Sequence, residues 1–329
     1  MTKLHRRGLL AAALAAPLAT PMLARHGWAQ PKWPSGQLRW VVAYAAGGAA
    51  DTVARNVGAR VSEILGQQVI IDNRTGGNSL VAQTAVLQAP KDGLTFLVDA
   101  ANQVTNEYLI KDIPFNYEKT WIPVTRLADF PQVLAVKSDF PAKTLAEYIA
   151  AAKAKPGTIG LGTPPAAGMA HMASEELQKR AGIKLIHAPF RGGADAARDI
   201  AAGAIDSVII TTSSIRPPLQ SGRCRILAVT SIKRAPTFPD VPTIAESGFP
   251  GFDLNDWNGL FAATGVPAEI VTRMQEACAE AIKDAKVKER LDPAGAILVA
   301  DTPADFKQWL DGQRKTLGKL IVDANIKLQ

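Results

Sequence analysis

The apolar positions of the chain form short runs that alternate with stretches of helical spacing. Short apolar runs predict strands, and apolar residues three or four apart predict helices. From the first run onward the order is strand, helix, strand, helix, strand, at about 38–43, 51–65, 69–71, 79–88 and 95–98. Strands separated by helices are typical of parallel βαβ units. The first third of the chain therefore predicts one α/β sheet.

The same alternation starts again after residue 132 and predicts a second sheet. Strands and helices are expected at 133–136, 145–154, 159–161, 169–181, 185–187, 194–202, 207–211 and 226–230. A proline-rich passage follows, then an apolar run at 260–263 and two amphipathic helices at 268–291 and 303–324. A chain of about 300 residues usually divides its core. We expect lobe 1 to contain 30–132 and 255–329 and lobe 2 to contain 133–254, with crossings near 130–136 and 252–260 as a hinge.

The N-terminal 29 residues have the pattern of a signal peptide. Lys3, Arg6 and Arg7 precede an apolar stretch at 9–23 that Pro17 and Pro21 interrupt. This stretch is too short for a membrane span, so we expect cleavage and export rather than membrane insertion. The Arg6-Arg7 pair also fits a twin-arginine signal, and the choice between the two export routes stays open.

Removal of this segment changes the charge balance. The whole chain carries 37 basic and 30 acidic side chains, and four of the basic ones lie in the segment. A mature net charge near +3, with no basic run among aromatics, argues against a nucleic-acid partner. The two cysteines, Cys224 and Cys278, have no metal-ligand spacing, and either a disulfide or two buried thiols fits the pattern.

Four loops between a strand and a helix combine glycine with hydroxyl or charged residues. Ligands of open parallel sheets bind at the carboxyl ends of strands, where helix N-termini present free N–H groups to anions. The loops are Tyr44–Asp51, Asp72–Ser79, Gly162–Gly168 and Pro189–Asp195, and Thr211 to Ser213 adds hydroxyls after a further strand. Their recurrence predicts an anion site shared by the two lobes.

Each loop residue also has a structural interpretation. Asp51 is either a ligand contact or an N-cap, and Arg191 is a carboxylate partner, a solvated side chain or a latch between lobes. His171 is more typical of a packed helical histidine than of a ligand. Gly168 and Gly192 allow backbone amides to approach a ligand. Asn102 ends an unusual loop after the third strand, in which Asp99 would repel a carboxylate unless it turns away.

Motifs for catalysis are absent from the sequence. There is no GxSxG elbow, HExxH, Walker loop, complete GxGxxG or paired-carboxylate motif. We therefore expect no catalytic residues, no cofactor and no metal site, and a protein that is not an enzyme.

The chain resembles the Bug-type receptors in the order and spacing of Tyr44–Asp51, Asp72–Ser79, Gly162–Glu176 and Ala188–Asp206, and most specifically in the stretches Ala228–Ala235, Asp240–Gly248 and Trp257–Leu260. These are the extracytoplasmic substrate-binding proteins of tripartite tricarboxylate transporters. The resemblance covers essentially the whole mature chain. It implies a type II two-lobe periplasmic-binding-protein fold, with two mainly parallel sheets flanked by helices and a ligand cleft at the hinge.

The resemblance also implies a site and a role. Ligand contacts are expected, from the resemblance or the loop chemistry above, at Tyr44, Ala46, Gly47, Gly48, Asp51, Ser79, Asn102, Gly162, Thr163, Gly168, Arg191, Gly192, Gly193 and Thr211. We expect a monomeric periplasmic receptor that delivers a small carboxylate to the membrane subunits of the transporter. The ligand stays open among a di- or tricarboxylate, an acidic amino acid and an aromatic carboxylate. An alternative with the same sequence features is a periplasmic sensor that feeds a signalling kinase.

Overall fold

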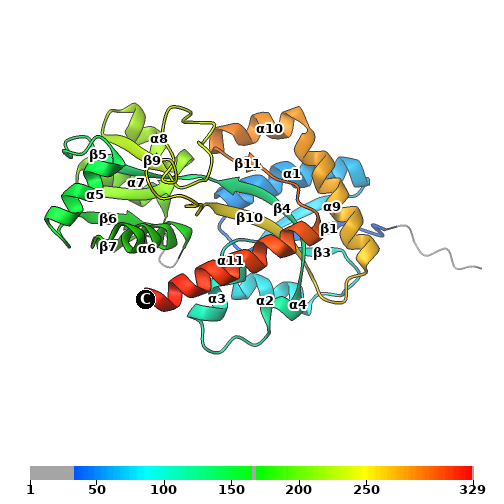
Figure 1. Cartoon of the computed structure of the whole chain (residues 1–329). Helices are drawn as coiled ribbons and strands as arrows, with labels where there is room; N and C mark the ends of the chain where they lie inside the picture. Colours follow the sequence, from blue (N-terminus) through cyan, green and yellow to red (C-terminus); the bar gives the residue numbers. More distant parts are fainter. Residues whose placement is uncertain (1–32, 165–167, 191, 328–329) are drawn as a thin grey trace, which may run out of the picture. The chain divides into compact units, whose positions relative to one another are not determined.

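The computed structural model describes residues 33–164, 168–190 and 192–327, and the expected signal peptide lies outside them. The described residues form one compact unit that contains two sheets. In the described chain the first sheet has six strands in the order β11-β4-β10-β3-β1-β2 and the second has five in the order β7-β6-β8-β5-β9. We call the elements around the first sheet lobe 1 and those around the second lobe 2 (Figure 1).

The strands of lobe 1 are β1 (Leu38–Val42), β2 (Val69–Asn73), β3 (Thr95–Asp99), β4 (Trp121–Phe130), β10 (Asp256–Ala263) and β11 (Ile297–Leu298). Those of lobe 2 are β5 (Gln132–Lys137), β6 (Gly160–Thr163), β7 (Ile186–Pro189), β8 (Ser207–Thr211) and β9 (Cys224–Val229).

The helices of lobe 1 are α1 (Ala49–Leu65), α2 (Leu80–Gln88), α3 (Asn102–Leu109), α4 (Tyr117–Thr120), α9 (Ala268–Lys283), α10 (Ala285–Leu291) and α11 (Pro303–Asp323), with a 3-10 turn at Asp292–Ala294. Those of lobe 2 are α5 (Leu145–Ala154), α6 (Met169–Ala181), α7 (Gly193–Ala202) and α8 (Thr212–Gln220).

Alternating strand residues fill two cores in lobe 1. Trp40 and Val42 of β1 belong to a core under α1 and α9, whereas Val41 belongs to a core on the opposite face, under α2, α3 and α11. Successive side chains of a strand point to opposite faces, and both faces here are covered. This explains why the strands appear in the sequence as continuous apolar runs rather than as alternating ones.

Lobe 2 has the same layered design. Leu134 and Val136 of β5 pack on the side of α5 and α6, and Val133 and Ala135 pack on the side of α7 and α8. The two lobes are joined directly at Pro131, which separates β4 from β5.

Both sheets are mixed, which corrects the expectation of mainly parallel sheets. The strands β1, β2 and β3 pair in parallel, as do β6, β7 and β8. The strands that enter or leave the crossings, β4, β5, β9 and β10, pair antiparallel with their neighbours. A chain that passes between two lobes must return in the opposite direction, and this return produces the antiparallel strands.

The helix expected over 268–291 is two helices. Asp284 has extended backbone, ψ 131°, and its side chain accepts a hydrogen bond from the Lys286 N–H at 2.8 Å, so it caps α10. The helical spacing of apolar residues continues through Ile282, Val287 and Leu291, which are all buried. The hydrophobic pattern therefore did not predict the break between the two helices.

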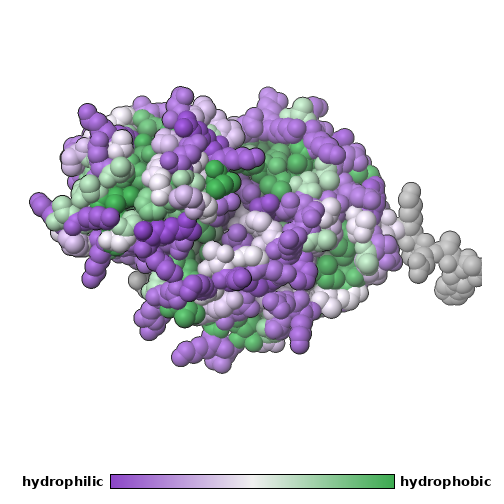
Figure 2. Space-filling view, in the orientation of Figure 1, coloured by the Kyte–Doolittle hydropathy of each residue, from purple (hydrophilic) through white to green (hydrophobic). Residues whose placement is uncertain are grey.

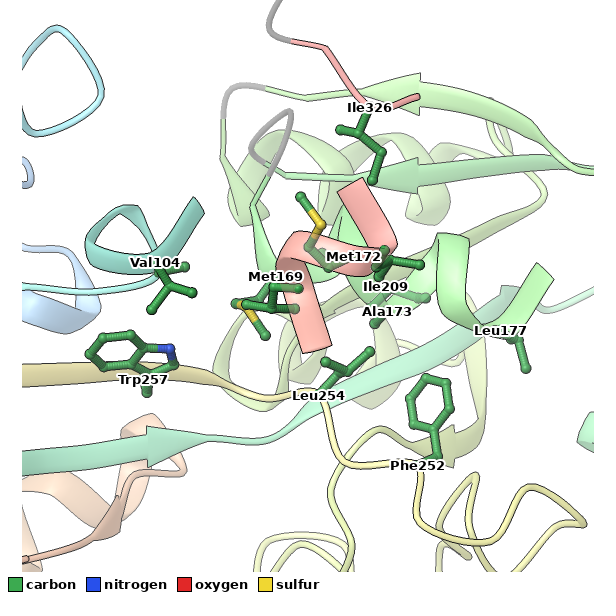
Figure 3. Close-up of a cluster of buried hydrophobic side chains, with 14 of the residues drawn as sticks. Val104, Met169, Met172, Ala173, Leu177, Ile209, Phe252, Leu254, Trp257 and Ile326 are labelled. Carbon is green, nitrogen blue, oxygen red and sulfur yellow. The ribbon is translucent and has the colours of Figure 1, made fainter. Parts of the chain in front are cut away.

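The C-terminal helix α11 reaches from lobe 1 to lobe 2. It packs on α3 and β4, and its far end contacts α6; Lys179 of α6 forms an ion pair with Asp323 at 2.6 Å. Figure 3 shows Met169 and Met172 of α6 near Val104 and Ile326, with Phe252 and Leu254 of the second crossing close by. All of these side chains are buried in one core that includes residues of both lobes.

Two points left by the sequence concern membranes and disulfides. Within the described chain, no helix combines the length and the apolar character that a membrane crossing requires. Cys224 and Cys278 are both buried and both free, so the open choice is settled in favour of two thiols.

Candidate ligand site

The loops singled out by sequence lie at the edges of the two sheets that meet the crossings. In lobe 1, Val42 at the end of β1 is aligned with Asn73 and Val98, so β1, β2 and β3 end together. Asp256, where β10 enters the lobe, is aligned with Phe130, where β4 leaves it. In lobe 2, Gln132 at the start of β5 is aligned with Thr211 at the end of β8. Both sets of loops therefore flank the hinge strands.

The helices that begin at these edges lack side-chain caps. Among the residues that the structure describes, no side chain of the cap residue makes a capping hydrogen bond at the N-termini of α1, α2, α3, α6, α7 and α8, whose cap residues are Gly48, Ser79, Ala101, Gly168, Gly192 and Thr211. Among the described helices that begin elsewhere, α4, α5, α10 and α11 are capped by Asn116, Thr144, Asp284 and Thr302, and α9 follows Pro267 without a cap. The first N–H groups of a helix have no acceptor within it. An anion is a suitable partner for N–H groups that no side chain occupies.

The first loop is held from beneath by Asp51. Its carboxylate is buried and accepts hydrogen bonds from the Gly47 N–H at 2.8 Å, Arg55 Nε at 2.9 Å and Asn73 Nδ2 at 2.9 Å. Burial alone would raise the pKa of Asp51, but these hydrogen bonds outweigh it and lower the pKa. Asp51 thus supports the loop, in which Ala46, Gly47 and Gly48 are exposed residues.

The first and second loops meet at a buried carboxylate, Asp99, at the end of β3. It accepts hydrogen bonds from Ser79 Oγ at 2.9 Å, Tyr44 Oη at 3.2 Å and the Ala100 N–H at 2.9 Å, and from the amides of Gln83 at 2.8 Å and Gln103 at 3.0 Å. Burial raises the pKa of Asp99, while these hydrogen bonds favour the ionised form. The carboxylate is thus turned inward, which is the orientation in which we expected it not to repel a ligand carboxylate.

Ser79 also has an unusual backbone. Asn78 and Ser79 have φ values of 50° and 73°, in the left-handed region that non-glycine residues rarely occupy. Asn102 Nδ2 donates to Ser79 Oγ at 2.7 Å, and Asn106 Nδ2 donates to the Asn78 carbonyl at 2.8 Å. The hydrogen bonds therefore hold in place a turn that its backbone alone would not favour.

In lobe 2, Gly162 and Thr163 are enclosed. A Cβ on Gly162 would lie 2.7 Å from the ring of Phe190, so glycine is needed for packing. Thr163 is fully buried, and its hydroxyl lies 2.6 Å from His187 Nε2. The His187 ring stacks on His171 with centroids 3.9 Å apart. Gly168 opens α6, and Arg191, the remaining candidate in this region, lies outside the described residues.

The other lobe 2 candidates lie where α7 and α8 begin. A Cβ on Gly193 would overlap the Ser214 hydroxyl, whereas one on Gly192 would have no neighbour within 4 Å among the described residues. Thr211 Oγ1 lies 3.1 Å from Ser213 Oγ and 2.9 Å from Ser214 Oγ. The Thr211 contacts lie within the start of α8, and the absence of a side chain at Gly193 allows the start of α7 to approach Ser214.

Sequence reasoning missed Asp256, Gln83 and Gln103. Asp256 accepts one hydrogen bond, from the Trp257 N–H at 2.9 Å, and burial raises its pKa to about 6. No local motif marks it, because its place beside the loops follows from the pairing of β10 with β3 and β4. The described chain contains no group of three or more His, Cys, Asp or Glu side chains arranged to hold a metal.

Comparisons with known proteins give the family. Residues 53–326 match the family model described as "Tripartite tricarboxylate transporter family receptor". The UPF0065 protein of the tcbD-tcbE intergenic region of Pseudomonas sp. strain P51 is 34% identical over 292 residues, which cover 88% of this chain and 87% of that protein.

Two solved structures are similar in sequence and fold. One from R. palustris, solved with adipate, is 30% identical with a TM-score of 0.79 over 90% of this chain and 100% of that one. MatC from Rhodopseudomonas palustris, with bound malate, is 27% identical with a TM-score of 0.74 over 88% and 99%. The chain therefore belongs to the tripartite tricarboxylate transporter receptor family and has its two-lobe fold.

Proposed function

We propose that the protein is a periplasmic receptor that captures a small carboxylate between its lobes and delivers it to the membrane subunits of a tripartite transporter. The observation that carries this proposal is the set of uncapped helix N-termini on both sides of the hinge strands. A carboxylate satisfies such N–H groups and is attracted by the positive ends of the helix dipoles.

The distribution of caps argues for a ligand rather than for chance. Side-chain caps stabilise a helix by about 1 kcal/mol each, and in the described part of the chain four helices that begin away from these loops have them. At the loops they are replaced by glycine, by alanine or by hydroxyl residues that make other hydrogen bonds. The missing stabilisation is regained when an anion binds.

The relatives support a carboxylate as the ligand class, since one was solved with adipate and another with malate. Ligand binding to both lobes would favour the arrangement in which they are close, because a ligand shifts a conformational equilibrium toward the state it binds better. Catalysis has no role in this proposal.

A thermal-shift screen of the exported protein tests the proposal. A ligand at about 100 times its dissociation constant adds about 2.7 kcal/mol to the free energy of unfolding. We expect one class of small carboxylate to raise the melting temperature by several degrees, and uncharged solutes of the same size to leave it unchanged. Silence from every carboxylate, with folded and ligand-free protein, would contradict the proposal.

A further inference from the structure

The hydroxyl groups of Tyr44 and Ser79, on the lobe 1 side of the site, both donate their protons to Asp99. Ser79 Oγ receives a hydrogen bond from Asn102 Nδ2, so its own proton points to Asp99. Tyr44 Oη also donates to Asp99. Toward a ligand, both oxygens can therefore act only as hydrogen-bond acceptors.

The neighbouring amides add further acceptors. Asn102 Nδ2 uses one N–H on Ser79, and no hydrogen bond to its Oδ1 is present in the described chain. Gln103 Nε2 donates to Asp99, and its buried Oε1 has no donor among the described residues. A buried acceptor without a donor is costly, so this corner of the site has a surplus of acceptors.

A second carboxylate, Asp256, lies on the same side. It precedes Gly259, which is aligned with Asp99, so it lies past the end of β3 beside the loop that carries Asn102. Its negative charge, with that of Asp99, helps to raise the pKa of Tyr44 after burial, the main cause. Among the described residues, neither Asp99 nor Asp256 forms an ion pair with a cationic side chain, because the nearby Arg55 and Arg126 pair with Asp51, Asp129 and Asp301.

We propose that this side of the site selects a ligand with a positively charged or N–H-bearing nitrogen, so that the protein's substrate is an amino-bearing carboxylate rather than a plain di- or tricarboxylate. The inference rests on the proposed function, because it takes the carboxylate end of the ligand to be bound at the helix N-termini. An ammonium group supplies the donors that Tyr44, Asn102 and Asp256 lack. A second carboxylate in this position would face these acceptors and Asp256, with the buried charge of Asp99 behind them.

Calorimetric titration with matched probe pairs tests this inference. In each pair a methyl group replaces the ammonium group: glutamate with 2-methylglutarate, aspartate with 2-methylsuccinate, and 2-aminoadipate with 2-methyladipate. We expect the amino-bearing member of at least one pair to bind tenfold or more tightly than its partner. Tighter or equal binding of the methyl member in every pair would overturn the inference and leave the proposed function intact.

Variants assign the preference to the two acids. Asp256→Asn removes a charge but keeps an oxygen for the Trp257 N–H, and we expect it to reduce the ratio of the two affinities at least fivefold. Asp99→Asn should do the same, and if it fails to fold, Asp256→Asn alone decides. Glu63→Gln is the matched control, because Glu63 is an exposed residue near the end of α1 that pairs with Arg60; its ratio should equal that of the wild type. An unchanged ratio in Asp256→Asn would overturn the inference, and so would failure of all six probes to bind. The proposed function is overturned only if the thermal-shift screen is silent for every carboxylate.

Discussion

The hydroxyl of Thr163 lies 2.6 Å from Nε2 of His187, and both residues belong to paired strands of lobe 2. Burial, and after it the neighbouring His171, lowers the pKa of His187 to about 4. The ring is therefore neutral at pH 7 and shares a hydrogen bond with Thr163. This pair fixes the end of β6, from which the loop to α6 departs.

Acidification should destabilise the fold through His187. The pKa of His187 in the unfolded chain is near 6.5. As the pH falls from 6.5 toward 4, the unfolded chain takes up a proton that the folded protein does not, so the free energy of unfolding decreases. We expect His187→Gln, which cannot be protonated, to lose about 2 kcal/mol less stability than the wild type between pH 7 and pH 4.5. Urea denaturation of both proteins across this range measures the difference; parallel pH profiles would contradict the low pKa of His187.

Adjacent glycines in lobe 2 should respond differently to alanine. Gly193→Ala places a Cβ against the Ser214 hydroxyl and 3.0 Å from its Cβ, so the Ser214 hydroxyl must turn away from Thr211 or α7 and α8 must move apart. Overpacking of this kind costs about 1–3 kcal/mol, and ligand affinity should fall with it. Gly192→Ala has open space and extended backbone, φ −163°, so it should change stability by less than about 0.5 kcal/mol. Equal melting temperatures for the two variants would refute this packing.

Sequence patterns predicted much of this architecture. The bounds of α5, α6 and β8 were expected as they occur, because each lies between clear loop signals and has the spacing of its class. The break at Asp284 and the mixed sheets were not expected. Neither has a local signal in the hydrophobic pattern, since one depends on a single cap and the other on the return of the chain through the hinge.

The site was predicted only in outline. Glycine-rich loops after strands indicated where the helix N-termini gather, and the comparisons confirm the family that those loops suggested. The sequence could not predict which groups donate hydrogen bonds to Asp99. Its partners Ser79 and Gln83 lie 20 and 16 residues away along the chain, and only the folded structure brings them together. The contacts that we assign to Tyr44, Ser79, Asn102 and the lobe 2 loops stay predictions until a ligand is bound.

Arg126 should be important for the hinge strands. Its guanidinium lies 3.0 Å from Asp129 and 3.0 Å from Asp301, and it stacks 4.3 Å from the ring centre of Trp309. Loss of one partner from a largely buried ion pair costs several kcal/mol of stability. Arg126→Gln should therefore reduce the free energy of unfolding by about 2–4 kcal/mol at pH 7.5.

The same variant should be less damaging at low pH. Burial raises the pKa of Asp129 to about 6 even with Arg126 present, and without the cation this carboxyl takes up a proton more readily in the folded state. A carboxyl group whose pKa is raised in the folded state stabilises the fold as the pH falls. The free energy of unfolding that Arg126→Gln loses relative to the wild type should therefore be smaller at pH 5 than at pH 7.5. Denaturation at the two pH values measures this, and a larger loss at pH 5 would contradict it.

The thiols should be inert in the native state. Cys224 and Cys278 belong to separate cores, and burial raises the pKa of Cys224 to about 11. Alkylation at pH 8 should modify neither cysteine in the folded protein and both after denaturation, as read by mass spectrometry. A mass two hydrogens lower under non-reducing denaturation would show a disulfide instead.

Calorimetric comparison of an acid with its own diamide tests the role of the helix N-termini most directly. The members of each pair differ in charge but hardly in shape: succinate and succinamide, glutarate and glutaramide, and adipate and adipamide. Glutamate and its diamide, glutamine amide, extend the series to amino-bearing ligands. We predict that at least one acid binds with a stoichiometry of one and that its diamide binds at least a hundredfold more weakly. Equal binding of an acid and its diamide, or no binding by any acid, would contradict an anion site at these helices.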